Sequence, residues 1–281
     1  MVTKEKIAIS IKGAKLVFGG GSATLFGIRT KDIQEILGVP CVNMGIHQGL
    51  QIDYQLYSLK KVLKKGDTVI LPLEYSCFSY NGDLSKITIE YVMTYDKEYL
   101  KHISIIKSLQ YIASLSPINL LNSIQIINKK DINNRYDSYN LNAYGDETSN
   151  VGKQNLDQEY KIAPPFGVSS NSFHETKGLE EISKFNVWCK QHGIMLYVTY
   201  ANTLYYKDYD NHTYRNYFDN LAKYFADHNI LTIGKPSDFF FNEDLCYDHH
   251  YHLNREGVTI RTQQLINMLE KVGIANHFNH L

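Results

Sequence analysis

Residues 14–27, AKLVFGGGSATLFG, place a short apolar run directly before three glycines and Ser22. An apolar run bounded by turn residues predicts a buried strand, and the residues after Ser22 predict the start of a helix. In doubly wound α/β folds, ligands bind at this kind of corner, outside the carboxyl ends of the strands. The stretch therefore indicates the fold class and also the place where a site is expected.

Further short apolar runs repeat this pattern at residues 41–45, 67–73, 194–200 and 230–234. The runs are continuous rather than alternating, which is typical of a parallel sheet covered on both faces, and helical patterns lie between them. We therefore predict a three-layer αβα sandwich with about five parallel strands, a flavodoxin-like arrangement within the α/β class.

Several helices can also be placed. Thr30 is expected to cap a helix that ends at Gly38, residues 48–63 are expected to form a second, and Asn254 is expected to cap the last. Another helix is predicted by an apolar stripe at spacings of three and four. Its members are Tyr214, Tyr217, Phe218, Leu221, Tyr224 and Phe225.

Residues 79–174 interrupt the alternation of strands and helices. We predict one amphipathic helix over residues 100–112 and a second over 118–127, followed by a polar, Asn-rich segment over 131–174. A loop of that length in a compact domain is usually a functional lid or a disordered segment. The expected organisation is one domain over residues 1–281, in which 79–174 form a cap or lid.

Composition excludes several classes of function. The 29 basic and 29 acidic side chains give a formal charge of zero, which argues against a nucleic-acid partner. The four cysteines form no CxxC pair, so neither a zinc knuckle nor a redox motif is suggested. No run approaches the length of a membrane span, and the first residues lack the apolar core of a signal peptide. The sequence therefore predicts a soluble globular protein.

The glycine corner has three possible chemical roles. A dinucleotide site needs G-x-G-x-x-G and a later acidic residue, but Thr24 takes the third glycine position and the second strand ends at Asn43. A P-loop needs a lysine that the corner lacks. The remaining interpretation is a serine nucleophile at Ser22, held where backbone amides can stabilise an oxyanion.

A serine nucleophile needs a base and a group that orients the base, and YDHHYHLNREG at residues 247–257 supplies both. Asp248 lies four positions before His252, within reach of its Nδ1 atom. Two alternatives remain at this point: a metal site that uses the clustered histidines, and a histidine cluster without a role. Beyond the cluster, no ligand motif completes a metal site, so we expect no metal and no cofactor.

Together, GGS at 20–22, N-x-G at 43–45 and D-x-x-Y-H-L-N-x-x-G at 248–257 resemble the SGNH, or GDSL-like, hydrolases. The resemblance is greatest to the branch with bacterial polysaccharide O-acetyltransferases and esterases. It implies that Ser22 is the nucleophile and that the amides of Ser22 and Gly45 bind the oxyanion. It also implies that His252 is the base and Asp248 its orienting carboxylate.

The sequence departs from the family pattern in three places. The first block has GGS instead of GDS. Asp248 precedes the histidine by four positions instead of three. A dyad in which Ser22 and His252 act without Asp248 is therefore an alternative to the triad. The third block, G-x-N-D, is replaced by residues 72–75, PLEY. That change leaves the third oxyanion donor unidentified, with Asn43 as a substitute.

Several residues near the altered third block have two interpretations each. Glu74 either contacts the substrate or is an exposed turn carboxylate, and Tyr75 is a weaker pocket candidate. His47 either lines the pocket or is a satisfied histidine at a helix start. Asn43 has a second interpretation, as a strand-end residue that holds a loop.

The expected function is serine-dependent acyl-ester chemistry, either esterase or O-acyltransferase, on an acetylated saccharide of the bacterial cell envelope. The expected partners are an acyl-ester donor, a saccharide or polysaccharide acceptor and, by resemblance, a membrane-bound acyltransferase. The resemblance also implies a tethered extracytoplasmic location with the anchor missing from this chain; otherwise the protein is cytoplasmic. The alternative function is a non-catalytic carbohydrate-binding or scaffold protein on a degenerate hydrolase fold.

Overall fold

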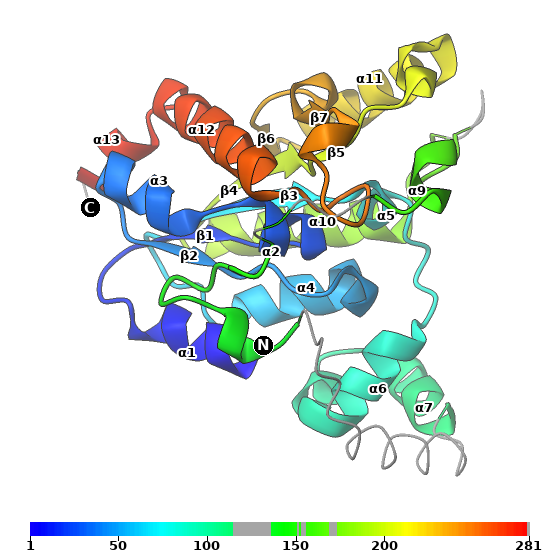
Figure 1. Cartoon of the computed structure of the whole chain (residues 1–281). Coiled ribbons are helices and arrows are strands. Elements are labelled where there is room, and N and C mark those ends of the chain that lie inside the picture. Colours follow the sequence, from blue (N-terminus) through cyan, green and yellow to red (C-terminus); the bar gives the residue numbers. More distant parts are fainter. Residues whose placement is uncertain (115–135, 151, 153–155, 169–172, 280–281) are drawn as a thin grey trace.

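A parallel five-stranded sheet forms the centre of the molecule in the computed structural model (Figure 1). The structure describes all residues except 115–135, 151, 153–155, 169–172 and 280–281. The strand order is β2-β1-β3-β4-β6. The bounds are β1 Leu16–Phe18, β2 Cys41–Asn43, β3 Thr68–Leu73, β4 Met195–Tyr200 and β6 Leu231–Thr232. The prediction of a five-stranded parallel sheet is therefore confirmed, and each strand lies inside its predicted run.

Both faces of the sheet are covered. Leu16 and Phe18 of β1 pack in one apolar cluster with α3 (Thr30–Leu37) and α12 (Arg255–Lys271). Val17, between them, packs in the opposite cluster with α4 (Gln51–Lys60) and α10 (Lys177–Gln191). Figure 1 shows α3 and α12 above the sheet and α4 below it. Because successive side chains of a strand point to opposite faces, two buried faces require a continuous apolar run.

Short elements complete this core. They are α1 (Val2–Ser10), α2 (Ser22–Gly27), η1 (Gln48–Leu50), α5 (Tyr75–Phe78), η4 (Lys207–Asp210), α11 (His212–Asp227), η5 (Pro236–Phe239), η6 (Glu243–Leu245) and α13 (Ile274–Asn279). Strands β5 (Thr203–Leu204) and β7 (Phe240–Phe241) form a separate parallel pair. The whole predicted stripe of α11 is buried. No helix among the described residues is long and apolar enough to cross a membrane.

Three helix ends can be compared with their predictions. Gly38 ends α3 in a left-handed conformation, with φ of 66°, and Asn254 caps α12 by accepting a hydrogen bond from the Gly257 amide. Both were predicted. Thr30, however, is the first residue of α3 and not its cap, because Asp146 accepts hydrogen bonds from its amide and hydroxyl. The predicted 48–63 helix is divided into η1 and α4 at Gln51, whose φ is 58°.

The described part of residues 79–174 has two regions. The first contains α6 (Lys86–Tyr95), η2 (Lys97–Lys101) and α7 (Ile105–Ala113), which lie below α4 in Figure 1. The predicted 100–112 helix is therefore divided between η2 and α7, while the predicted 118–127 helix lies outside the described residues. After α7 the chain contains η3 (Ser138–Asn140) and then a short helix, α9 (Glu159–Ile162).

The second region, residues 136–150, is called the bridging segment below. It is polar, as predicted, but it is bonded firmly to the core. Asp146 binds the start of α3, and the Asn43 amide donates to the Tyr144 carbonyl at 2.8 Å. Gly145 lies so close to β2 that a Cβ atom there would come within 2.5 Å of the Asn43 carbonyl oxygen. These contacts place the bridging segment along the edge of the sheet at which β2 ends.

Candidate active site

Neighbouring side chains lie very close to the backbone of the glycine corner. Gly20 has a φ of 125°, which favours glycine, and a Cβ atom there would come within 2.8 Å of the Thr24 hydroxyl. At Gly21, a Cβ atom would come within 2.1 Å of Gln48 Oε1 and 2.4 Å of Glu74 Oε1. An aspartate cannot occupy this position without displacing both side chains. The sharp turn therefore fixes where α2 begins, and Ser22 is its first residue.

Ser22 lies on the same side of α2 as the predicted base. Ser22 is only 5% exposed. Phe26 lies one helical turn after Ser22, on the same face of α2. The ring of Phe26 contacts the ring of His252, with 4.5 Å between their centroids. No hydrogen bond joins Ser22 Oγ and His252 Nε2, two described atoms, and such bonds commonly tighten only when substrate binds.

His252 is held by Asp248 in a closed loop. The amide of Tyr247 donates to the His252 carbonyl at 2.8 Å, and Cys246 pairs with Leu253 in an antiparallel bridge. This closure turns the side chains of Asp248 and His252 toward each other, with 2.9 Å between Asp248 Oδ1 and His252 Nδ1. A carboxylate only accepts hydrogen bonds, so Nδ1 carries the proton and Nε2 is left in the form that a general base needs. The four-residue spacing therefore permits the contact.

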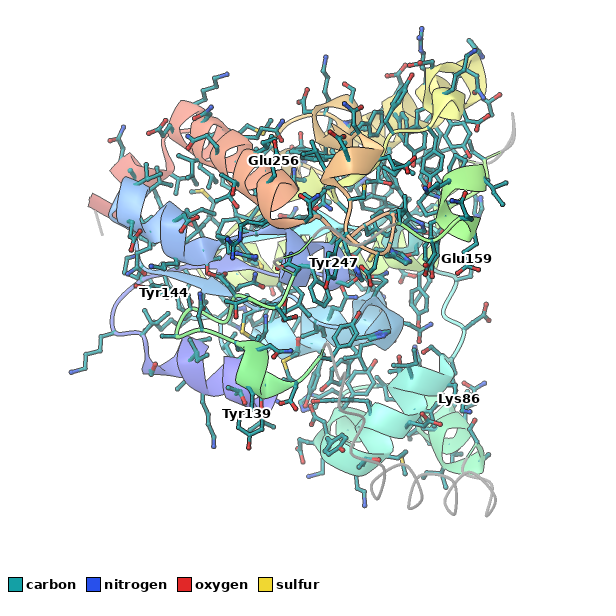
Figure 2. All side chains as sticks on the ribbon, viewed as in Figure 1. Lys86, Tyr139, Tyr144, Glu159, Tyr247 and Glu256 are labelled. Carbon is teal, nitrogen blue, oxygen red and sulfur yellow. The ribbon has the colours of Figure 1, made fainter. Side chains whose placement is uncertain are left out.

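Three hydrogen bonds fix this loop against the nucleophile corner. Asn150 Nδ2 donates to the carbonyl oxygens of both Phe26 and Leu253, each at 2.8 Å. Asn202 Nδ2 donates to the Tyr251 carbonyl at 2.8 Å. Asn150 thus joins α2 directly to the residue after His252. Figure 2 labels Tyr247 in this loop and Glu256 in α12, the helix that follows it.

The neighbouring histidines are buried beside His252. The ring centroid of His249 lies 3.9 Å from that of His250 and 4.9 Å from that of His252. Burial lowers the pKa of His249 to about 3 and that of His250 to about 2, so both rings are neutral at physiological pH. Among the described residues, no group of three or more His, Cys, Asp or Glu side chains is arranged to hold a metal ion.

Two of the predicted oxyanion donors have other partners. The Gly45 amide donates to Asn43 Oδ1 at 2.9 Å, and Asn43 Nδ2 donates to the carbonyl oxygens of Thr24 at 3.1 Å and Ile28 at 3.4 Å. Lys4 Nζ also donates to the Asn43 carbonyl oxygen. In this structure the Asn43 side chain therefore ties down the loop after β2, and the role of Gly45 and Asn43 as oxyanion donors stays a prediction.

Glu74 and Tyr75 also differ from their predictions. Glu74 is fully buried rather than exposed, and its carboxylate accepts hydrogen bonds from the amides of Gly21 and Ala23. Tyr75 is buried too, and its ring stacks on Phe166 with 4.2 Å between centroids. Its amide donates to the Tyr251 hydroxyl, which adds a further connection between this turn and the His252 loop. Tyr75 is thus a packing residue rather than a wall of the pocket.

His47 lies at the start of a short helix and also beside a pocket. Its Nδ1 accepts a hydrogen bond from the Gly49 amide and caps η1. Its ring also lines a pocket of about 260 Å³ together with Leu25 of α2 and Gly45. Tyr136, another lining residue, contacts the rings of both His47 and Phe26, with centroids 4.5 and 5.6 Å apart. Ring contacts thus connect Tyr136 of the pocket wall to Phe26, and Phe26 to His252.

Two residues that the sequence analysis missed help to build this site. Asn150 belongs to a polar segment without periodicity, and nothing in its local pattern distinguishes it from its neighbours. Asn202 follows β4, where the carboxyl end of a parallel strand is a usual place for site residues. Its position directly after a predicted strand could therefore have identified Asn202 as a site residue.

We expect the substitution Asn150→Ala to lower kcat for ester turnover by about 100-fold, because a small displacement of His252 relative to Ser22 costs about that factor. KM should change much less. The measurement is steady-state kinetics with p-nitrophenyl acetate, and Ser149→Ala, an exposed neighbour in the bridging segment, is the matched control. A variant that keeps its melting temperature and also its kcat would show that Asn150 does not position the site.

No protein-family model and no curated protein sequence matches the chain. Similar solved structures include an acetyl xylan esterase, 15% identical, with a TM-score of 0.43 over 92% of this chain and 99% of the other. A member of the lipolytic G-D-S-L family from Veillonella parvula is 10% identical, with a TM-score of 0.41 over 92% and 100%. A GDSL-like lipase from Bacteroides thetaiotaomicron is 10% identical, with a TM-score of 0.41 over 95% and 93%. At such identities and TM-scores, the chemistry has to be argued from this chain's own residues.

Proposed function

We propose that this chain is a serine-dependent esterase or O-acyltransferase of the SGNH type. The observation that carries the proposal is the 2.9 Å contact between Asp248 and His252, in a loop packed against the helix that begins at Ser22. A serine, a histidine that can take its proton and a carboxylate that orients the histidine form the machinery of nucleophilic acyl transfer. The glycine corner explains why the serine lies at the end of β1.

The proposed reaction has two acyl-transfer steps. His252 Nε2 removes the proton from Ser22 Oγ as the oxygen attacks the ester carbonyl carbon, and the carbonyl oxygen takes the negative charge. The same histidine then gives its proton to the leaving alcohol as the carbon–oxygen bond breaks. Water or a sugar hydroxyl resolves the acyl-enzyme by the reverse sequence. Asp248 stabilises the imidazolium form that exists between these proton transfers.

The Ser22 amide is the proposed oxyanion donor. It belongs to the first turn of α2, where backbone amides have no partner within the helix, and no described residue accepts a hydrogen bond from it. Since Gly45 and Asn43 are engaged elsewhere, this donor works without the two that were expected. Loss of one donor typically lowers turnover by about 10²–10³-fold, so we propose a slow, specialised enzyme.

The proposed substrate is an acetyl ester of a saccharide. The 260 Å³ pocket lined by Leu25 of α2, Gly45 and His47 supports a small-molecule substrate. Its wall combines Tyr91 and Tyr136 with the polar side chains of Lys4 and Glu147. Aromatic faces next to a few polar groups suit a sugar ring. A polysaccharide acceptor, a membrane-bound acyltransferase partner and an extracytoplasmic location remain parts of this proposal that come from the motif resemblance.

The proposal predicts a substrate profile. Purified protein should release acetate from acetylated xylo-oligosaccharides with a higher kcat/KM than from p-nitrophenyl acetate, because the sugar can occupy the pocket. The unacetylated oligosaccharide, added with p-nitrophenyl acetate, should yield acetylated sugar if the enzyme transfers and only acetate if it hydrolyses. Mass spectrometry of the products distinguishes the two. Saccharide binding without turnover of any ester would contradict the enzyme and favour the binding-protein alternative.

A further inference from the structure

Glu74 forms hydrogen bonds on both sides of the proposed nucleophile. Its Oε1 atom accepts from the Ala23 amide at 2.9 Å, and its Oε2 atom accepts from the Gly21 amide at 3.2 Å. Ser22 is the residue between those two amides. The carboxylate also lies where the aspartate of a GDS motif would project, since both of its oxygens are within 2.6 Å of a Cβ atom placed on Gly21.

This placement has opposite effects in the two protonation states of Glu74. As a carboxylate, it holds the turn through two hydrogen bonds but puts a full negative charge beside the Ser22 amide. An ester oxygen that becomes negative at that amide is repelled, and burial makes the repulsion stronger than it is in water. As a neutral acid, Glu74 still offers oxygen acceptors to the turn, but the repulsion is gone.

We propose that Glu74 is a positioning residue that sets the activity of Ser22 through its protonation state, with the neutral acid as the active form. This inference rests on the proposed function. Glu74 thereby does two things: it replaces the motif aspartate as the support of the nucleophile turn, and it limits oxyanion stabilisation whenever it is ionised.

The surroundings of Glu74 bring its change of protonation state into the physiological pH range. It is fully buried, and desolvation raises its pKa to about 7 although the amides of Ala23 and Gly21 oppose the shift. The ionisable groups that face it are the Cys77 thiol and the Tyr251 phenol, whose pKa values burial raises above their ordinary values. Both groups therefore stay neutral over the range in which Glu74 titrates. Of the other elements at this corner, η1 contributes the uncharged amide of Gln48.

The test is the pH dependence of Ser22 modification by a fluorophosphonate, measured by intact mass for the wild type and for Glu74→Gln. Wild-type labelling should fall by about tenfold per pH unit once Glu74 ionises, above about pH 7. Glu74→Gln should lack the alkaline fall and react at least about tenfold faster than wild type at pH 9. Glu256→Gln, an exposed carboxylate on α12 that Figure 2 labels, is the matched control and should follow the wild-type curve.

Each outcome decides a different point. A wild-type rate that stays level from pH 7 to 9 overturns the role of Glu74, and this result does not depend on whether the variant folds. Identical curves for wild type and Glu74→Gln overturn it as well. Glu74→Gln that is folded by circular dichroism yet unreactive at every pH would mean that the carboxylate itself is required. If wild type forms no Ser22 adduct at any pH, the proposed function fails, and this proposal fails with it.

Discussion

Replacing Ser22 with alanine should lower kcat/KM for p-nitrophenyl acetate by about 10⁴–10⁶-fold, the loss expected when a nucleophile of this type is removed. The hydroxyl makes no hydrogen bond with any residue that the structure describes, so its removal should leave the fold intact. The melting temperature of the variant should therefore stay within a few degrees of wild type, which ties the loss to chemistry.

The matched control for this variant is Ser237→Ala, which removes an exposed hydroxyl from η5. Its kcat/KM should equal that of wild type. If Ser22→Ala kept more than about a tenth of the wild-type value, another group would have to be the nucleophile. Contamination by a host esterase is recognised in the same experiment, because it would give both variants equal activity.

Replacing His252 with alanine is expected to have a similar effect, a fall in kcat/KM of about 10⁴-fold or more. The base is then absent, while the Ser22 hydroxyl and its amide remain. Asp248→Asn should lower kcat/KM by about 10⁴-fold without removing any atom from the contact, because an amide can stabilise the wrong tautomer of the ring. Steady-state kinetics between pH 6 and 9 measure both losses.

The double variant distinguishes a triad from a dyad. If Asp248 acts through His252, Asp248→Asn should have little further effect once His252 is alanine, because residues that work as a unit are not additive. His250→Ala is the control for the loop: this ring is buried beside His249 but does not contact Asp248 through any hydrogen bond among the described residues. Losses that multiply in the double variant would contradict the assignment of Asp248 as the partner of His252.

The sheet could be predicted from sequence because a strand buried on both faces must be continuously apolar. Val17 and Phe18 illustrate this: neighbours in sequence, they pack on opposite faces of β1. Strand ends were predicted less accurately, since the apolar runs continue into turns. The division at Gln51 was missed because a left-handed backbone at a non-glycine residue leaves no signature in the local pattern.

The pairing of Asp248 with His252 could be anticipated because both residues lie in one short loop. The oxyanion donors could not be predicted in the same way. Whether the Asn43 side-chain amide is available depends on its hydrogen bond to Thr24 of α2, which is remote in sequence, and the same side chain accepts from the Gly45 amide. Glu74 was expected to be exposed because a turn carboxylate usually is, and only the two amides of the glycine corner explain its burial.

The bridging segment is the clearest limit of the sequence analysis. A polar stretch without periodicity predicts a lid or disorder, yet Asp146 and Asn150 are buried and bond to α3, α2 and the loop of His252. Long-range hydrogen bonds of this kind satisfy buried backbone groups that secondary structure leaves open. Such hydrogen bonds cannot be predicted from amino-acid composition, because an exposed loop can have the same composition.

The central claim is that Ser22 is a nucleophile activated by His252. The most direct measurement is intact-mass spectrometry after incubation with a fluorophosphonate, followed by peptide mapping, on wild type, Ser22→Ala and His252→Ala. The account predicts one adduct per chain on Ser22 in wild type, none in Ser22→Ala and much slower labelling of His252→Ala. Folded wild-type protein that forms no adduct, or forms one elsewhere than Ser22, would contradict it.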